Sequence, residues 1–196
     1  AMAEVSRNAE QAREIGYLRP TDRVVMNRFE LLEIAKSEAR AMAAAGYRAL
    51  VPDLYRGKVA LAANEAEHLM NELNFGDAAG QDVRGAVQHL KATGSAKVGV
   101  SGYCMGGALT LLAAVFVPEV DAAVPYYGYP PLEYIDTAKL KAPLMGHWAT
   151  QDQAFPIASV DALDDKLKAA GVDYIGNRYL AYHAFANETA IGRNRI

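Results

Sequence analysis

The single cysteine of this chain stands in a pattern that could make it a nucleophile. Gly102-Tyr103-Cys104-Met105-Gly106 has the spacing of a nucleophile elbow, G-x-S-x-G, with sulfur in place of oxygen. A β-branched run at 98–100 precedes it and an apolar helical pattern at 108–116 follows, so the sequence predicts strand, tight turn and helix. The helix start would favour a thiolate on Cys104, and the backbone N–H of Met105 would serve as an oxyanion donor. The alternative is a small buried cysteine in a glycine-rich turn.

An acid and a base follow two later apolar runs. Asp152 comes after the run at 143–148, and His183 comes after the run at 174–179. Because the carboxyl ends of parallel strands meet at one edge of a sheet, we expect both side chains near Cys104. In that arrangement His183 would take the thiol proton, and Asp152 would fix the imidazole tautomer. The alternatives are a surface histidine and a turn aspartate.

The other three histidines are weaker candidates. His147 is the rival base, but it lies inside the predicted strand at 143–148, where we expect a buried structural imidazole. His68 and His89 fall in predicted helices and should lie on the surface. None has metal-ligand spacing to another histidine, cysteine or acid, and the glycines near Cys104 do not form the dinucleotide-binding pattern G-x-G-x-x-G. The sequence therefore predicts neither a metal nor a cofactor.

Alternating strands and helices would position these residues. The pattern predicts helices at 30–45, 64–73, 77–92, 108–116 and 159–170, with Asn64 as an N-cap and Gly46 and Gly171 as stops. It predicts buried strands at 48–51, 98–101, 122–127, 143–148 and 174–179, after a short strand pair at 17–18 and 24–26. This alternation indicates an α/β fold with a mostly parallel central sheet and helices on both faces.

Length and composition narrow the class of protein. A chain of 196 residues, 52% hydrophobic, fits one domain spanning 1–196. Its net charge of −3 does not favour nucleic acid or an anionic membrane as a partner, and one cysteine excludes internal disulfides. No apolar run approaches the roughly 18 residues of a membrane helix, and the first residues carry acids where a signal peptide would be apolar. We expect a cytoplasmic protein, a monomer or small homo-oligomer, that acts on a small molecule.

These residues resemble the dienelactone hydrolase family, the cysteine-nucleophile branch of the α/β hydrolases. The resemblance extends from about residue 46 to residue 189, through the segments 46–55, 102–107, 126–128, 151–156 and 183–188. It implies an α/β-hydrolase fold and a catalytic triad of Cys104, Asp152 and His183. The implied chemistry is the cofactor-free opening of a lactone or ester through a thioester intermediate.

The resemblance also indicates where this chain departs from the family. The N-terminal region and the C-terminal end are shorter than in family members. The family carries a glutamate that helps the cysteine lose its proton, and the register after Met26 places Asn27 there. The same loop would supply a second oxyanion N–H at Arg28. An amide at Asn27 leaves two resting states open, a thiolate–imidazolium pair or a protonated thiol, and we favour the second because burying a charged sulfur is costly.

Substrate recognition departs from the family as well. Members that cleave dienelactone carry an arginine four places after the histidine, and this chain has Asn187 there. Asn187 and Tyr103 are therefore placed among the substrate-binding residues. The alternative function is a non-catalytic or weakly active domain that binds a small ligand or a partner, and rapid alkylation of Cys104 would argue against it.

Overall fold

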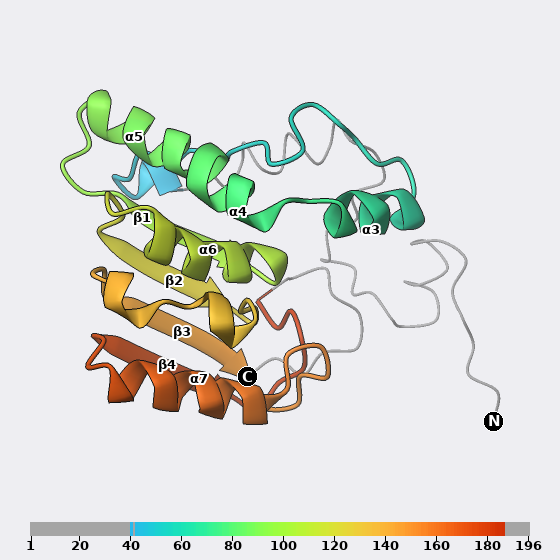
Figure 1. Cartoon of the computed structure of the whole chain (residues 1–196). Coiled ribbons are helices and arrows are strands. Elements are labelled where there is room, and N and C mark those ends of the chain that lie inside the picture. The colour runs from blue at the N-terminus through green and yellow to red at the C-terminus, as the bar shows by residue number, and fades with distance from the viewer. Residues whose placement is uncertain (1–39, 41, 187–196) are drawn as a thin grey trace.

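The computed structural model describes Arg40 and residues 42–186. Four strands form one parallel sheet in the order β1-β2-β3-β4 (Figure 1). Their bounds are Gly99–Tyr103 for β1, Ala122–Tyr126 for β2, Leu144–Ala149 for β3 and Tyr174–Tyr179 for β4. Four of the five strands predicted in this part of the chain are confirmed, with shifts of one or two residues at some ends.

Helices connect the strands. The helix α6, Met105–Phe116, joins β1 to β2, and α7, Ile157–Ala169, joins β3 to β4. Two short 3₁₀ turns, η2 at Leu132–Tyr134 and η3 at Thr137–Lys139, occupy the connection from β2 to β3. The predicted stop at Gly171 is confirmed, because this glycine follows α7 with φ 68°.

Between residues 63 and 92 the chain is helical in four pieces. α3 spans Ala63–Asn71, α4 spans Phe75–Asp77, a π-helical turn η1 spans Ala78–Val83, and α5 spans Arg84–Ala92. The helix predicted at 77–92 thus begins earlier and contains a π segment. Its start is set by the side chain of Asn74, which accepts the N–H of Asp77 at 3.1 Å.

The predicted cap at Asn64 is wrong. Ala62 occupies the N-cap position of α3, and Asn64 already lies inside the helix. Ala62 has no side chain that could cap, and Glu65 instead accepts the backbone N–H of Leu61 at 2.7 Å. A first-turn acid therefore replaces the expected asparagine.

The predicted strand at 48–51 is also wrong. These residues pair with no strand in the described part of the chain, and their side chains are exposed. The Arg48 guanidinium donates to the carbonyls of Leu90 and Thr93, at 3.3 and 2.9 Å, at the end of α5. An apolar run becomes a strand only when a neighbour supplies a hydrogen-bond ladder, and this segment is anchored to a helix end instead.

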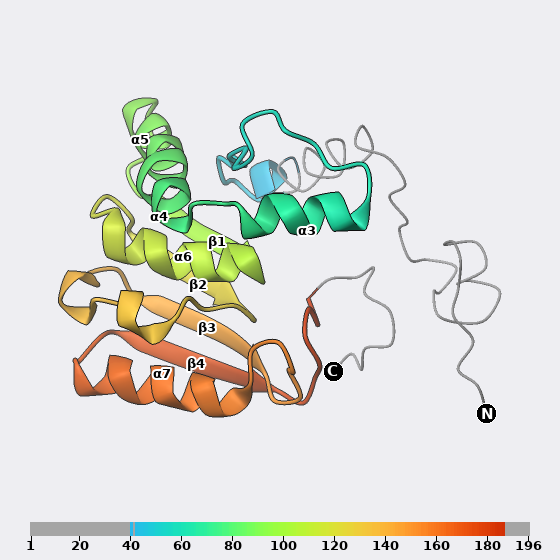
Figure 2. The ribbon, with the colours of Figure 1, turned by 45° about the vertical axis from the view of Figure 1, so that its right-hand side comes forward.

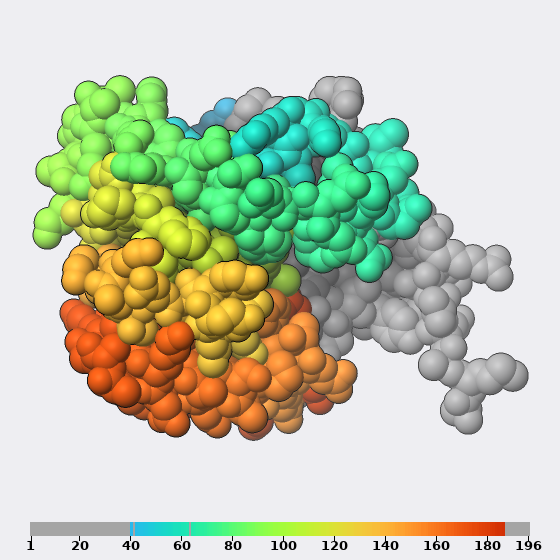
Figure 3. All heavy atoms as spheres, viewed as in Figure 1, coloured from blue at the N-terminus to red at the C-terminus, as the bar shows by residue number. Residues whose placement is uncertain are grey.

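The helices α6 and α7 cover one face of the sheet, and α5 packs beside α6 near the β1 edge (Figure 2). α6 and α7 bury a common apolar cluster against β2, β3 and β4, which includes Leu111, Leu144, Trp148, Leu163 and Leu167. On the surface, the residues between β2 and β3 fill the space between α6 and α7 (Figure 3). No helix among the described residues has both the length and the apolar character needed to cross a membrane.

The opposite face of the sheet carries exposed side chains. Tyr103, Met145 and Ile175 are 54%, 41% and 53% exposed there. The helix predicted at 30–45 lies mostly outside the described residues, as do the strands predicted at 17–18 and 24–26. Its described end agrees with the prediction, because Gly46, with φ 90°, follows the last helical residues.

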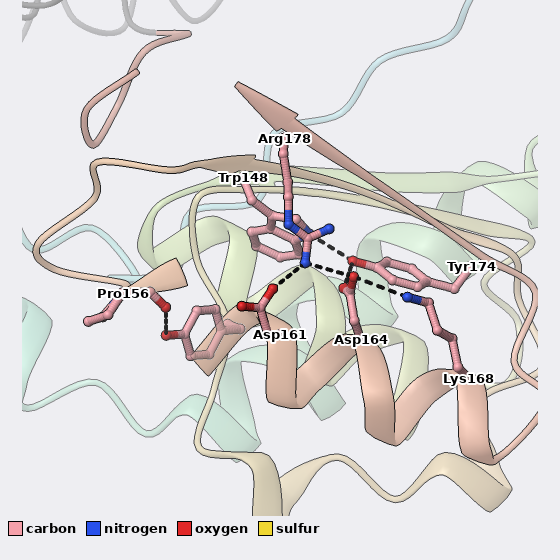
Figure 4. A network of polar contacts seen from close by, with 8 residues as sticks. Trp148, Pro156, Asp161, Asp164, Lys168, Tyr174 and Arg178 are labelled. Carbon is pink, nitrogen blue, oxygen red and sulfur yellow. Dashed lines mark hydrogen bonds and ion pairs between the residues drawn. The ribbon is translucent and has the colours of Figure 1, made fainter. Parts of the chain in front are cut away.

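A buried carboxylate holds α7 to the sheet. Asp164 accepts the hydroxyl of Tyr174 at 2.6 Å and the Arg178 guanidinium at 2.9 Å (Figure 4). Burial and the bond to Asp164 raise the pKa of Tyr174, so its hydroxyl stays protonated and remains a donor. The indole N–H of Trp148 donates to the same hydroxyl at 2.8 Å. The network therefore ties the helix to β3 and β4.

We expect Asp164→Ala to lower the free energy of unfolding by about 3 kcal/mol, because it removes the buried carboxylate to which Tyr174 and Arg178 donate hydrogen bonds. Asp161 is the matched control, since it binds the same Arg178 at 2.6 Å but is 60% exposed. Asp161→Ala should cost less than about 1 kcal/mol. Denaturant unfolding measures both, and equal losses would contradict the role given to burial.

Candidate active site

Cys104 lies on a strained turn between β1 and α6. Its backbone has φ 54° and ψ −117°, a conformation that costs energy for any residue with a side chain. Glycines make the turn possible: a Cβ at Gly102 would strike the carbonyl of Gly106, and a Cβ at Gly128 would strike the carbonyl of Cys104 itself. The turn has the geometry of the predicted nucleophile elbow.

The structure brings Cys104, Asp152 and His183 together. The imidazole Nδ1 of His183 lies 2.8 Å from Oδ2 of Asp152, and its Nε2 lies 3.2 Å from Sγ of Cys104. The three residues follow β1, β3 and β4, so the carboxyl edge of the parallel sheet collects them as the chain order predicts. The imidazole is placed to pass a proton between sulfur and a reacting group.

Asp152 combines the two roles that the sequence left as alternatives. Its Oδ1 accepts the backbone N–H groups of Ala154 and Phe155, both at 2.9 Å, as a turn aspartate would. Its Oδ2 is the atom that faces His183. The turn thus fixes the carboxylate, and the fixed carboxylate orients the imidazole.

Proton affinities in this site favour charge separation. The hydrogen bond with His183 lowers the pKa of the Cys104 thiol, against the opposing effect of burial, and the backbone N–H of Met105 lowers it further. The bond with Cys104 raises the pKa of His183, and the bond with Asp152 adds to this. Of the two resting states left open by the sequence, these directions favour the thiolate–imidazolium pair rather than the protonated thiol.

Met105 opens α6, where its backbone N–H is available as the expected oxyanion donor. Its thioether lies 3.5 Å from the hydroxyl of Tyr55, a contact that the sequence did not indicate. Tyr55 in turn lines a cavity of about 220 Å³ between the 54–58 loop, α3 and α4. Burial raises the pKa of this tyrosine.

The remaining predicted site residues are placed as follows. Tyr103 ends β1, and its ring contacts Tyr126 and Tyr127, with centroids 4.7 and 6.0 Å away. Arg28 and Asn187 lie outside the described residues, as does Asn27. Tyr103 is not hydrogen-bonded to Cys104, Asp152 or His183 in the described part of the chain, and its contact with substrate stays a prediction.

The other histidines have the surroundings expected of non-catalytic residues. His147 is half-buried, stacks on Tyr126 with ring centroids 4.3 Å apart, and lies 2.7 Å from the hydroxyl of Tyr179 through its Nδ1. Burial lowers its pKa. His68 and His89 are exposed on helices, as predicted.

The fold and this arrangement define an α/β hydrolase, with the nucleophile on a turn after one strand and the acid and histidine after later strands. The chain belongs to the dienelactone hydrolase family, whose sequence model matches residues 28–195.

Two relatives show the extent of the similarity. The "Putative carboxymethylenebutenolidase" of Methylorubrum extorquens is 35% identical over 169 residues, which cover 78% of this chain and 58% of that protein. "Protein usf" of Aquifex pyrophilus is 35% identical over 150 residues, covering 73% of this chain and 65% of that protein. The chain thus spans about three fifths of the length of such relatives.

Solved structures agree with this assignment. A dienelactone hydrolase-type protein of Klebsiella pneumoniae matches with a TM-score of 0.65 and 26% identity, over 81% of this chain and 72% of that one. A dienelactone hydrolase-like phosphotriesterase from metagenomic libraries matches with a TM-score of 0.70 and 22% identity, over 87% and 74%. The second comparison supports the fold alone.

Proposed function

We propose that this chain is a cofactor-independent hydrolase that opens small lactones or esters through a thioester on Cys104. The observation that carries the proposal is the position of His183, hydrogen-bonded to both Asp152 and Cys104 at the elbow. Membership of the dienelactone hydrolase family supports the choice of substrate bond.

The proposed reaction has two halves. In the first, the Cys104 thiolate attacks the carbonyl carbon, and the Met105 N–H stabilises the negative oxygen. As the carbon–oxygen bond breaks, the His183 imidazolium gives its Nε2 proton to the leaving alkoxide. In a lactone the alkoxide stays attached to the acyl group, so the ring opens while the thioester forms.

Water completes the second half. Neutral His183 takes a proton from water, which attacks the thioester carbonyl, and the sulfur leaves as the thiolate of Cys104. The product is a carboxylic acid, with the alcohol on the same molecule if the substrate was a lactone. Asp152 stabilises the imidazolium that forms in each cycle.

The proposal includes residues beyond this group. It assigns a second oxyanion donor to the backbone N–H of Arg28 and substrate contacts to Tyr103 and Asn187. It also treats residues 1–196 as a single cytoplasmic domain, a monomer or small homo-oligomer.

A trapping experiment tests the proposal. The protein is mixed with p-nitrophenyl acetate or a small lactone, quenched in acid, digested and analysed by mass spectrometry. We expect an acyl group on the peptide that contains Cys104, and loss of hydrolysis after iodoacetamide treatment. Hydrolysis that survives alkylation would overturn the thioester mechanism, and a chain with neither hydrolysis nor adduct would fit the binding-domain alternative.

A further inference from the structure

His183 lies in a part of the chain that regular structure does not hold. β4 ends at Tyr179, and residues 180–186 form neither helix nor strand. The loop is tied at its start, where Gln151 donates its N–H to the carbonyl of Ala181 at 3.0 Å. Ala184, the residue after His183, has a left-handed φ of 57°, a conformation that the surrounding structure has to hold in place. The imidazole is hydrogen-bonded to Asp152 and Cys104, and its faces and edges are open to contacts from other side chains.

Two aromatic rings supply such contacts. The ring of Phe155 stacks on the imidazole of His183, with centroids 5.6 Å apart and planes inclined by 20°. The ring of Tyr127 meets the same imidazole edge-on, with centroids 5.1 Å apart and an angle of 73°. They come from the loops after β3 and β2, so the imidazole is constrained from two directions.

Phe155 is itself held firmly. Tyr129 packs edge-on against its ring, with centroids 5.0 Å apart. Its backbone N–H donates to Oδ1 of Asp152 at 2.9 Å. One residue therefore contacts both the acid and the histidine, through its backbone and its ring respectively.

We propose that Phe155 is a positioning residue for His183, whose stacked ring keeps the imidazole aligned between Asp152 and Cys104 and stabilises its positive form. This inference rests on the proposed function for its kinetic consequence only. An aromatic face attracts a cation whose centre lies within about 6 Å of the ring centroid, so the stack favours imidazolium over neutral imidazole. Among the residues that the structure describes, the titratable groups that face His183 are the Asp152 carboxyl, the Cys104 thiol and the Tyr127 phenol, and the first two also favour the cation.

The test compares two substitutions at this position. Phe155→Leu removes the aromatic face but retains an apolar side chain and the backbone N–H that Asp152 accepts. Phe155→Tyr retains the aromatic face and should behave like the wild-type chain. Phe116→Leu is the matched control, because Phe116 ends α6, is 38% exposed and makes no ring contact with His183 in the described part of the chain.

Three readouts separate positioning from packing. We expect Phe155→Leu to lower the pKa of His183, which NMR titration measures, with His183→Ala used to assign the resonance. The same substitution should slow alkylation of Cys104 about 3-fold just below neutral pH. For an aryl ester, kcat should fall about 10-fold with KM little changed, since a misplaced base affects the chemical step. Phe155→Tyr should restore all three values, and Phe116→Leu should leave them unchanged.

The outcomes distinguish this inference from the proposed function. An unchanged His183 titration and unchanged alkylation in Phe155→Leu would overturn the positioning role, whatever the esterase activity. If Phe155→Tyr fails to restore these values, the positioning role is also overturned, because an aromatic face at this position would then not be sufficient. If the wild-type chain hydrolyses no ester but Phe155→Leu still lowers the pKa of His183, the positioning role stands and the hydrolase proposal fails.

Discussion

Cys104→Ala is expected to lower kcat/KM for ester hydrolysis by about 10³-fold or more, because it removes the atom that forms the covalent intermediate. The fold should survive, since alanine can occupy the same strained turn at no greater cost than cysteine, and the lost side chain is small. We expect the free energy of unfolding to change by no more than about 1 kcal/mol. Steady-state kinetics and denaturant unfolding measure the two quantities.

Cys104→Ser gives the informative comparison. A hydroxyl is a far weaker acid than a thiol, and the bond with His183 and the helix start are suited to stabilising a thiolate. We therefore expect serine to remain at least about 10²-fold below cysteine. Full activity of the alanine variant would place the chemistry at another residue, whereas a fully active serine variant would show that thiolate formation is unimportant.

The rate at which iodoacetamide alkylates Cys104 should depend on pH through His183. The hydrogen bond between the two groups lowers the thiol pKa and raises the imidazole pKa, and both shifts favour the thiolate–imidazolium pair. Alkylation should therefore remain fast well below the ordinary thiol pKa of about 8.5. In His183→Ala the midpoint should move up toward that ordinary value, because the main cause of the lowering is gone.

A matched histidine checks the assignment. His89 lies exposed on α5, and His89→Ala should leave the alkylation profile unchanged. If His183→Ala also leaves it unchanged, the helix start alone would account for the reactivity of Cys104. Stopped-flow or mass-spectrometric rates across the pH range would separate the two results.

The site could be predicted because its signals are local and ordered along the chain. Of the two glycines that flank Cys104 in the motif, Gly102 lies where a Cβ would strike the backbone, whereas a Cβ at Gly106 would meet open space. Asp152 and His183 were found because each follows a buried apolar run, and parallel strands bring such positions to one edge. Chain order therefore carried most of the three-dimensional information about these residues.

Other features depend on contacts that no local pattern contains. The run at 48–51 has the composition of a strand, yet Arg48 binds the end of α5, more than 40 residues away. The stack of Phe155 on His183 joins two loops, and an aromatic residue three places after an aspartate gives no sign of its partner. Asn64 is a good cap by residue type, but helix starts are the least certain boundaries.

The four strands of the described residues lie in the sheet in the same order as in the chain, and this has a consequence for how the protein is made. During synthesis each new strand can pair with the one before it, so every addition closes only a short loop. The contact between Cys104 and His183 joins residues 79 apart and requires all four strands. The contribution of His183 to thiol reactivity thus appears only when β4 has docked, and a nascent chain that stalls before β4 carries a less reactive cysteine.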